Sequence, residues 1–298
     1  MDTTNLSKTI KLNNGLEVPR IGMGTYAIPE LANVIYNSIK NGLRLIDTAF
    51  FYSNEKEVGE AVNRAINDKI IERKDVSIMT KIWFTDKHRP EESLQQQLKL
   101  LNLSYVDIYL DHWPFNTYVV DGKTYNVPTQ VFWRNMEGLV KKGLTKSIGV
   151  SNYNVQSLMD LLSYCEIKPV VNQVEYHPYL FQKGLIEFCN ANDIRLVAYN
   201  SLCRGKYTDK FHNKGINLNL LEEKVVNDTA TKYKKSAGQI ALNWALSQGV
   251  IIIPSSSKPE RMKENMESDT FTLSNEDIEY IGTLNKDYRF CPLTWNHI

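Results

Sequence analysis

Three short apolar runs decide the fold: residues 43–47 read LRLID, residues 76–81 read VSIMTK and residues 106–112 read VDIYLDH. Each run has the length of a β-strand and ends in a charged or polar residue. Between the runs, apolar residues recur at helical spacing within residues 58–66 and 94–101. Strands that alternate with helices favour a parallel sheet, because parallel neighbours need crossover connections.

The same alternation continues along the rest of the chain. Two further helical faces lie within residues 132–140 and 155–162. The other strand-length runs are residues 21–25, 147–150, 170–174, 194–198 and 250–253. Eight strand–helix units in 298 residues predict an α/β fold, a single-domain (β/α)8 TIM barrel over residues 1–298, rather than two doubly wound domains.

Three connecting segments fall outside this alternation. Residues 8–12 and 16–19 flank Asn13-Asn14-Gly15, and Asn-Gly supports the positive φ angles of a hairpin turn, so we expect an N-terminal β-hairpin cap at the bottom of the barrel. Residues 204–219 are polar and lack an apolar period, which predicts a long loop after strand 7, either functional or a passive surface insertion. We expect residues 115–127 to be irregular and to shape a pocket.

Composition excludes several classes of protein. Lys and Arg number 35 against 34 Asp and Glu, and the net charge of +1 argues against a dedicated nucleic-acid binder, which needs a basic excess. The 42% apolar content is too high for a disordered chain. The aliphatic run at residues 250–253 is far shorter than the roughly 20 residues of a membrane helix. With no secretory signal at the N-terminus, we expect a cytoplasmic protein without membrane or nucleic-acid partners.

The cysteines indicate neither a metal site nor a disulfide framework. Four are present, far apart in sequence and without a Cys-x-x-Cys pair: Cys165, Cys189, Cys203 and Cys291. We therefore expect free thiols in a reducing cytoplasm and no bound metal. No exposed apolar helix face is evident in the sequence, so we expect a monomer.

The polar residues at the strand ends indicate the chemistry. In a barrel of this class the active site lies at the carboxyl ends of the strands. Asp47, Lys81 and His112 end three consecutive strands, and Tyr52 follows Asp47 by five residues. Taken singly, a strand-end lysine is usually a solvated charge and a tyrosine is usually a packing residue. Their convergence on one rim favours a catalytic role.

These four side chains suit proton donation to a carbonyl oxygen. A free phenol has a pKa of about 10 and is a reluctant acid at neutral pH. We expect Lys81 to lower the pKa of Tyr52, Asp47 to hold the lysine, and His112 to orient a substrate oxygen. The source of electrons is not evident, because Gly22-Met23-Gly24 is only the first half of a Rossmann dinucleotide motif.

At these positions the chain resembles the aldo-keto reductase family. Residues 47–59, DTAFFYSNEKEVG, are similar to the family signature Asp-x-Ala-x-x-Tyr-x-Asn-Glu-x-x-Val-Gly. Four more segments resemble family motifs in the same order: 107–114 (DIYLDHWP), 147–153 (SIGVSNY), 172–178 (NQVEYHP) and 198–202 (AYNSL). The resemblance therefore extends over nearly the whole chain.

The resemblance implies reduction of an aldehyde or ketone by hydride transfer from NADPH. It implies that Tyr52 is the general acid, that Lys81 and Asp47 tune it, and that His112 positions the carbonyl. The cofactor-binding residues that it implies are Gly24, Thr25, Asp47, Ser151, Asn152, Gln173, Tyr199, Asn200, Leu202, Ser255, Ser256, Arg261, Glu264 and Asn265.

The resemblance also implies a substrate pocket lined by Tyr26, Trp83 and Trp113, although large aromatic residues are also ordinary core residues. Ser151 and Asn152 would equally suit a simple strand-end turn. The loop from residue 204 would fold over the cofactor's pyrophosphate. The ending at residues 288–295 is loosely similar to the tails of aldose and xylose reductases, which suggests aldehydes or open-chain sugars as substrates.

One departure from the family pattern concerns the cofactor. The family usually has Ile-Pro-Lys-Ser after the last strand, where this chain has Ser255 in place of the lysine that contacts the adenosine 2′-phosphate. A lost charge-assisted bond of about 1.5–3 kcal/mol weakens NADPH binding roughly 10- to 100-fold. Arg261 still suits a phosphate, so we expect NADPH as first choice and NADH as second.

Two other departures lie near the catalytic residues. Asp111 stands where the family usually has an aliphatic residue, and strand alternation turns it away from His112, toward the helices. Because an unpaired buried carboxylate is costly, we expect Asp111 to have a partner or to be exposed. Tyr26 replaces the usual tryptophan, which adds a hydroxyl group to the pocket.

Two alternatives to an NADPH-dependent reductase remain open from the sequence. One is a catalytically weak cofactor-sensing or structural protein that keeps the barrel only for binding. The other is an enzyme that oxidises alcohols with the oxidised cofactor, since reaction direction follows cofactor ratios and not active-site residues.

Overall fold

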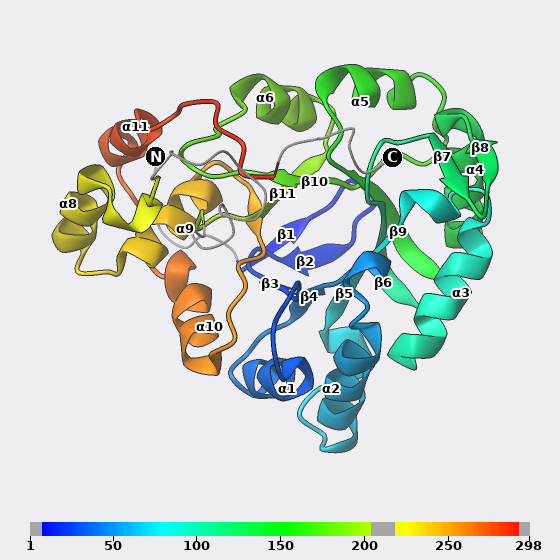
Figure 1. The fold of residues 1–298 in the computed structure, drawn as a ribbon. Coiled ribbons are helices and arrows are strands. Elements are labelled where there is room, and N and C mark those ends of the chain that lie inside the picture. The colour runs from blue at the N-terminus through cyan, green and yellow to red at the C-terminus, as the bar shows by residue number, and fades with distance from the viewer. Residues whose placement is uncertain (1–7, 204–217, 292–298) are drawn as a thin grey trace.

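A ring of parallel strands forms the centre of the molecule (Figure 1). The computed structural model describes residues 8–203 and 218–291. The strands, in ring order, are β3 (Met23–Gly24), β4 (Leu45–Asp47), β5 (Ser77–Ile82), β6 (Val106–Asp111), β9 (Thr145–Ser151), β10 (Val171–Glu175), β11 (Arg195–Tyr199) and β12 (Ile251–Ile252). A parallel bridge between Ile21 and Ile252 closes the ring. The predicted (β/α)8 barrel is confirmed, and every predicted strand run overlaps one of these strands.

Helices surround the ring on its outer side (Figure 1). They are α1 (Leu31–Lys40), α2 (Glu55–Asn67), α3 (Pro90–Leu101), α4 (Thr129–Lys141), α5 (Val155–Leu162), α6 (Lys183–Ala191), α8 (Lys224–Tyr233), α9 (Ala237–Ser247), α10 (Pro259–Met266) and α11 (Asn275–Gly282). Each of the helical faces expected from the sequence lies on one of these helices. In α2, for example, Val58, Ala61 and Val62 are buried against the sheet.

Two apolar layers follow from the alternation of side chains along the strands. The outer layer joins the sheet to the helices and includes Ile46, Ile78 and Tyr109. The inner layer fills the barrel and consists of Leu12, Val18, Leu45, Met79, Ile108, Leu110, Val170, Val171, Val197, Ile251 and Ile253. Asp47, Lys81 and His112 lie two residues beyond inward-facing Leu45, Met79 and Leu110, so their side chains also face inward.

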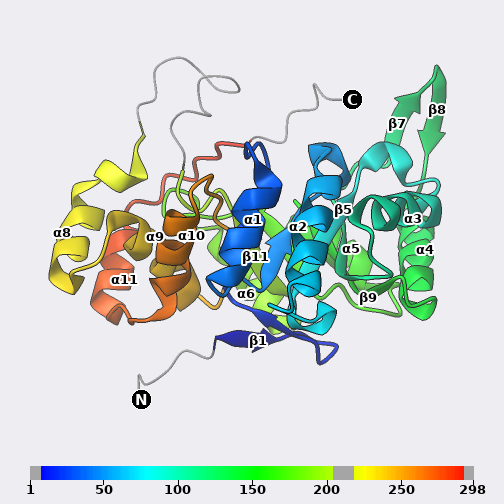
Figure 2. The same ribbon diagram turned by 90° about the horizontal axis from the view of Figure 1, so that it is seen from below.

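The N-terminal hairpin closes the bottom of the barrel, as predicted (Figure 2). Strands β1 (Thr9–Lys11) and β2 (Glu17–Pro19) pair antiparallel, and Gly15 in the turn has φ of 88°. Leu12 and Val18 belong to the inner apolar layer. Asn14 donates a side-chain hydrogen bond of 2.7 Å to Ser147 of β9, which attaches the hairpin to the barrel.

The connection at residues 115–127, expected to be irregular, instead contains a second hairpin. Strands β7 (Thr117–Val120) and β8 (Lys123–Asn126) pair antiparallel and project from the end of the barrel opposite to β1 and β2 (Figure 2). Asp121 and Gly122 at its turn have φ angles of 49° and 74°. An Asp-Gly pair favours this turn, which was the sequence signal for the hairpin.

The long loop predicted after strand 7 lies largely outside the described residues, since residues 204–217 are not among them. In the described parts of the chain, no helix has the length and apolar character needed to span a membrane. The same parts contain no group of three or more His, Cys, Asp or Glu side chains that could hold a metal ion.

Gly59 allows helices α2 and α3 to pack closely. A Cβ atom at this position would lie 2.3 Å from the backbone oxygen of Leu101, at the end of α3. That oxygen also accepts a 3.1 Å hydrogen bond from the side chain of Asn63, one turn along α2. The glycine of the signature segment therefore has a packing role, since any side chain would push the two helices apart.

We predict that Gly59→Ala lowers the free energy of unfolding by about 1–3 kcal/mol, because the added methyl group must displace backbone. Gly138→Ala is the matched control, since Gly138 lies within α4 and a Cβ there would meet nothing within 4 Å. The control should be stabilised by up to about 1 kcal/mol through helix propensity. Urea unfolding measures both changes, and equal effects at the two sites would contradict the packing role.

Candidate active site

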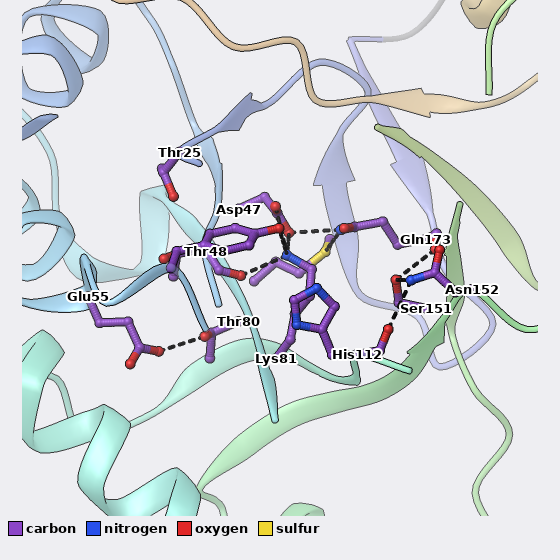
Figure 3. Close-up of polar contacts among 12 residues, drawn as sticks. Thr25, Asp47, Thr48, Glu55, Thr80, Lys81, His112, Ser151, Asn152 and Gln173 are labelled. Atoms are coloured by element: carbon purple, nitrogen blue, oxygen red, sulfur yellow. Dashed lines mark hydrogen bonds and ion pairs between the residues drawn. The ribbon is translucent and has the colours of Figure 1, made fainter. Parts of the chain in front are cut away.

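A buried ion pair lies at the centre of the barrel mouth (Figure 3). The Nζ atom of Lys81 lies 2.8 Å from each carboxylate oxygen of Asp47. It also donates to the backbone oxygen of Thr48 at 2.8 Å. Gln173 donates its side-chain amide to Asp47 at 2.8 Å from the opposite side of the barrel. These bonds offset the cost of taking both charges out of water.

Tyr52 reaches this pair through a short 3-10 helix, η1 (Phe50–Tyr52), that follows β4. Its hydroxyl oxygen lies 3.3 Å from Nζ of Lys81. Thr48 donates to the side-chain oxygen of Asn54 at 2.7 Å, and Asn54 donates to the backbone oxygen of Thr25 at 2.9 Å. The segment between β4 and α2 is thereby held against the end of β3, and this fixes the position of the phenol.

His112 lies beside Tyr52 at the end of β6. Its ring centre is 5.8 Å from that of Tyr52 and 5.2 Å from that of Trp83. The side-chain amide of Asn152 donates to the backbone oxygen of His112 at 3.0 Å. The imidazole is buried, and Nδ1 has no hydrogen-bond partner within residues 8–203 and 218–291. The four predicted catalytic residues therefore lie together at one point of the mouth.

Burial sets the protonation of these groups. Desolvation, with the neighbouring Lys81 ammonium, lowers the pKa of His112 well below its ordinary value of 6.5. Desolvation, with the negative charge of Asp47, raises the pKa of Tyr52 well above 10.0. We expected a lowered pKa for Tyr52, and this direction is wrong, because burial of the phenol and the charge of Asp47 both raise its pKa. Burial also lowers the pKa of Lys81.

Some of the residues that we predicted to bind the cofactor form a second group, on and next to the neighbouring strands β9, β10 and β11. Ser151 donates its hydroxyl to the backbone oxygen of Gln173 at 2.8 Å. The amide nitrogen of Asn152 donates to Ser151 at 3.1 Å, and its oxygen accepts from the Tyr199 hydroxyl at 2.8 Å. Since Gln173 also binds Asp47, this chain of hydrogen bonds joins the second group to the catalytic residues (Figure 3).

Four other predicted cofactor residues border the same mouth. Gly24 donates its backbone N–H to Pro254 at 3.2 Å, and Thr25 donates to the backbone oxygen of Asp47 at 3.1 Å. Asn200 turns its side-chain amide toward Glu175, at 2.9 Å. The fourth is Leu202, which is half-buried and packs against the outer apolar layer.

The remaining predicted cofactor residues, from Ser255 to Asn265, form a third group after β12 and on α10. Ser255 is half-buried, Ser256 is buried and Arg261 is exposed. Glu264 accepts a hydrogen bond from Ser236 at the start of α9. Asn265 is buried and contacts the sulfur of Met262 at 3.8 Å. The bond to Glu264 therefore joins α10 to the residue before α9, and the contact of Asn265 stays within α10.

The predicted pocket residues form an aromatic wall beside His112. Trp113 stacks over His112 with ring centres 6.2 Å apart, and Trp83 meets the imidazole edge-on. Trp83 stacks on Phe51 at 4.2 Å. Tyr26 lies 5.0 Å from the Tyr52 ring and is 45% exposed. These rings place apolar surface of low dielectric beside His112 and Tyr52.

Sequence reasoning missed a supporting network behind Lys81. Glu55 accepts hydrogen bonds of 2.7 Å from Thr80 and from Gln97. Gln97 also donates to the backbone oxygen of Lys81 at 3.1 Å and accepts from Tyr109 at 2.7 Å. Glu55 lies in the signature segment 47–59, so a buried acid at a helix start was a signal available in the sequence.

Glu175 was also missed, although it ends β10 inside a quoted motif. Its carboxylate accepts backbone hydrogen bonds from Phe290 at 2.9 Å and Cys291 at 2.8 Å. The side chains of His177 and Asn200 also contact it, at 3.1 and 2.9 Å. Burial opposes ionisation, but these hydrogen bonds lower the pKa of Glu175. One buried acid therefore binds the C-terminal segment to the mouth of the barrel.

Comparison with known proteins identifies the family of this barrel. The model of the aldo/keto reductase family matches residues 19–286. This chain belongs to that family. It is 40% identical to aldose reductase C of Dictyostelium discoideum, over 96% of this chain and 92% of the relative. It is 37% identical to the NADH-dependent D-xylose reductase of Candida parapsilosis (97% and 96%) and to an NAD(P)H-dependent D-xylose reductase of Candida tropicalis (100% and 99%).

Membership of the aldo/keto reductase family confirms the resemblance found in the sequence motifs. The protein is an oxidoreductase that acts on small carbonyl compounds. The relatives named for NADH or NAD(P)H support a nicotinamide cofactor. A purely structural or cofactor-sensing role is not favoured.

The His112 imidazole should remain neutral well below its ordinary pKa. We expect no protonation step for this ring near pH 6.5, because burial disfavours the cation. The unfolded chain binds this proton at its ordinary pKa, so acidification below pH 6.5 lowers stability. An NMR titration of the histidine ring signals follows the protonation of each ring, and the signal that His112→Asn removes is that of His112.

The other four of the five histidines provide the control for this titration, since their signals should persist in the variant. A protonation step of the assigned ring near pH 6.5 would contradict the neutral imidazole.

Proposed function

We propose that this aldo/keto reductase reduces aldehydes and ketones to alcohols with NADPH, and that Tyr52 is the general acid. The observation that carries the proposal is the meeting of Tyr52, Lys81, Asp47 and His112 at one point of the barrel mouth. This set contains a proton donor, a cation beside it and a neutral imidazole, but no activated nucleophile.

The residues around this point fit a nicotinamide cofactor. A carboxamide needs both hydrogen-bond donors and acceptors, and Ser151, Asn152 and Gln173 supply both kinds from buried positions. The phenol ring of Tyr199 would stack on the nicotinamide. When bound, the cofactor supplies the hydride that the protein lacks. Gly24, Thr25, Asn200 and Leu202 would border it at the mouth.

Tyr52 is suited to give its proton late in the reaction. Its raised pKa keeps the phenol protonated at neutral pH, so the proton is available to the oxygen as negative charge develops there. The phenolate left behind would lie 3.3 Å from the Lys81 ammonium, which Asp47 holds in place. The neutral His112 ring can donate a hydrogen bond to the same oxygen without losing its proton.

For the cofactor, we propose NADPH as first choice and NADH as second. Ser255, Ser256 and Arg261 would hold the adenosine 2′-phosphate, with Glu264 and Asn265 near the adenine. The exposed Arg261 guanidinium suits a phosphate and supports NADPH as first choice. The serine at position 255, in place of a lysine, supports NADH as second choice. Relatives named for NADH and for NAD(P)H both lie at 37% identity.

For the substrate, we propose aldehydes that include open-chain aldoses. The relatives are named D-xylose reductase and aldose reductase, which supports this class. Tyr26, Trp83 and Trp113 would contact the substrate.

We also propose that residues 1–298 act as one domain and that the enzyme is a cytoplasmic monomer. NADPH oxidation over a panel of aldehydes, ketones and aldoses tests the substrate class, and no turnover of any aldehyde would contradict it.

Tyr52→Phe should lower kcat by about 10²- to 10⁴-fold, because the variant loses the proton donor. NADPH affinity should stay within about three-fold of wild type, since the ring and its neighbours remain. Steady-state kinetics and cofactor fluorescence titration measure the two effects. Tyr36→Phe is the control and should retain full activity, since the Tyr36 hydroxyl on α1 bonds to Asp68 at the end of α2. Undiminished turnover in Tyr52→Phe would end the general-acid assignment.

Ser255→Lys should increase the preference for NADPH over NADH by roughly 10- to 100-fold, because it adds a charge-assisted bond to the 2′-phosphate. Equilibrium titration of both cofactors measures this preference. Ser257→Lys adds the same charge to the exposed neighbouring position and should have little effect. If the wild-type enzyme already prefers NADPH over NADH by 100-fold or more, Ser255 does not weaken NADPH binding, and the prediction is wrong.

A further inference from the structure

A buried polar cluster lies directly behind His112, on the outer side of the sheet. Asp111 accepts hydrogen bonds from Nζ of Lys87 at 2.6 Å and from the hydroxyl of Tyr153 at 2.8 Å. The side chains of Asp111 and Lys87 are both 0% exposed. Asp111 therefore has the partner expected from the sequence, and it has two. We call these three residues the Asp111 cluster.

The Asp111 cluster joins three loops of the barrel mouth. Lys87 follows the short helix η3 (Phe84–Asp86) in the loop after β5, and the same loop begins with Trp83. Asp111 immediately precedes His112 at the end of β6. Tyr153 immediately follows Asn152 after β9. Each member is therefore close in sequence to a residue that we place at the cofactor or substrate.

The residues next to the cluster also contact one another on its inner side. Trp83 meets the His112 ring edge-on at 5.2 Å, and Asn152 donates to the backbone oxygen of His112 at 3.0 Å. Strand alternation turns Asp111 outward and His112 inward. A contact behind the strand thus supports the three residues that face the mouth.

The loops after β9 and β5 each have a support besides the Asp111 cluster. Asn172 donates to the backbone oxygen of Tyr153 at 2.9 Å, which holds the loop after β9 to β10. In the loop after β5, the backbone N–H of His88 donates to the hydroxyl of Tyr118 at 3.1 Å. Loss of the ion pair should therefore loosen the segment from Trp83 to Lys87 without unfolding either loop.

Stability alone does not account for this ion pair. Removing two charges from water costs several kcal/mol, and apolar residues of similar volume often serve a core equally well. A hydrogen-bonded pair differs from apolar packing because it fixes the distance and direction between the groups that it joins. The cluster therefore supplies orientation to the loops it connects.

We propose that Asp111, held by Lys87 and Tyr153, is a positioning residue that orients the His112 imidazole and the Trp83 loop toward the carbonyl substrate. The cluster touches neither substrate nor cofactor and acts through His112. The proposal rests on the proposed role of His112 in the reaction. It predicts that orientation of the carbonyl, rather than cofactor binding, depends on the cluster.

The test uses the double variant Lys87→Met/Asp111→Leu, which fills the volume and leaves no unpaired charge. Because the buried Tyr153 hydroxyl loses its acceptor, we expect the melting temperature to fall by a few degrees, while NADPH affinity stays within about three-fold. We expect kcat/KM for an aldehyde to fall about 10-fold or more, mainly through kcat, because a misplaced reacting group slows chemistry. The isotope effect on kcat with 4-deuterated NADPH should rise as hydride transfer becomes limiting.

Arg73→Met is the matched control for this experiment. Arg73 pairs at 2.8 Å with Asp107, which lies on the same outward face of β6 at the opposite end of the strand. Lys146 also lies 2.8 Å from Asp107, so the carboxylate keeps a partner in the variant. This control should keep kcat/KM and the isotope effect within about two-fold of wild type. An equal loss of kcat/KM in the control would overturn the proposal.

Hydrogen exchange gives a second measurement that does not depend on turnover. Backbone amides in residues 83–88 should exchange faster in the double variant than in wild type or Arg73→Met. If Tyr52→Phe retained turnover, the proposed function would fail while this measurement still tested the loop. A double variant with wild-type kcat/KM, isotope effect and exchange would overturn the positioning role.

Discussion

The buried ion pair between Lys81 and Asp47 is the interaction on which the site depends. It places two charges at the top of an otherwise apolar barrel interior, where each requires hydrogen-bond partners. Gln173 supplies one from the far side, and from it a chain of hydrogen bonds runs to Ser151, Asn152 and Tyr199. Polar groups from five strands are thus aligned, because both charges of the pair need hydrogen-bond partners.

The architecture was predictable because it rests on local patterns. Strand-length apolar runs alternate with helical faces, and alternation along three strands turns Asp47, Lys81 and His112 inward. The hairpin at residues 117–126 was missed although Asp121-Gly122 marks its turn. That signal was weak because the flanking strands are short and largely polar.

What the sequence could not predict depends on three-dimensional burial. The nearby charge of Lys81 suggested a lowered pKa for Tyr52, but desolvation of the buried phenol, with the charge of Asp47, raises the pKa instead. Strand alternation required a partner for Asp111 but could not name it, since Lys87 lies on a loop 24 residues earlier. The third group, from Ser255 to Asn265, follows β12 and continues on α10. With a net charge of only +1, the phosphate binding that we propose would rest on a few local groups there.

The hydrogen bonds that Glu175 accepts from Phe290 and Cys291 make the two ends of the chain unequal for protein engineering. The described chain begins at residue 8, on the hairpin that closes the bottom of the barrel (Figure 2). A purification tag or fusion partner placed before this hairpin is attached on the face away from the chemistry. An extension of the other end follows a segment that is bound beside Tyr199 and Asn200 at the mouth. Immobilisation through the N-terminus is therefore the orientation that leaves substrate and cofactor free access.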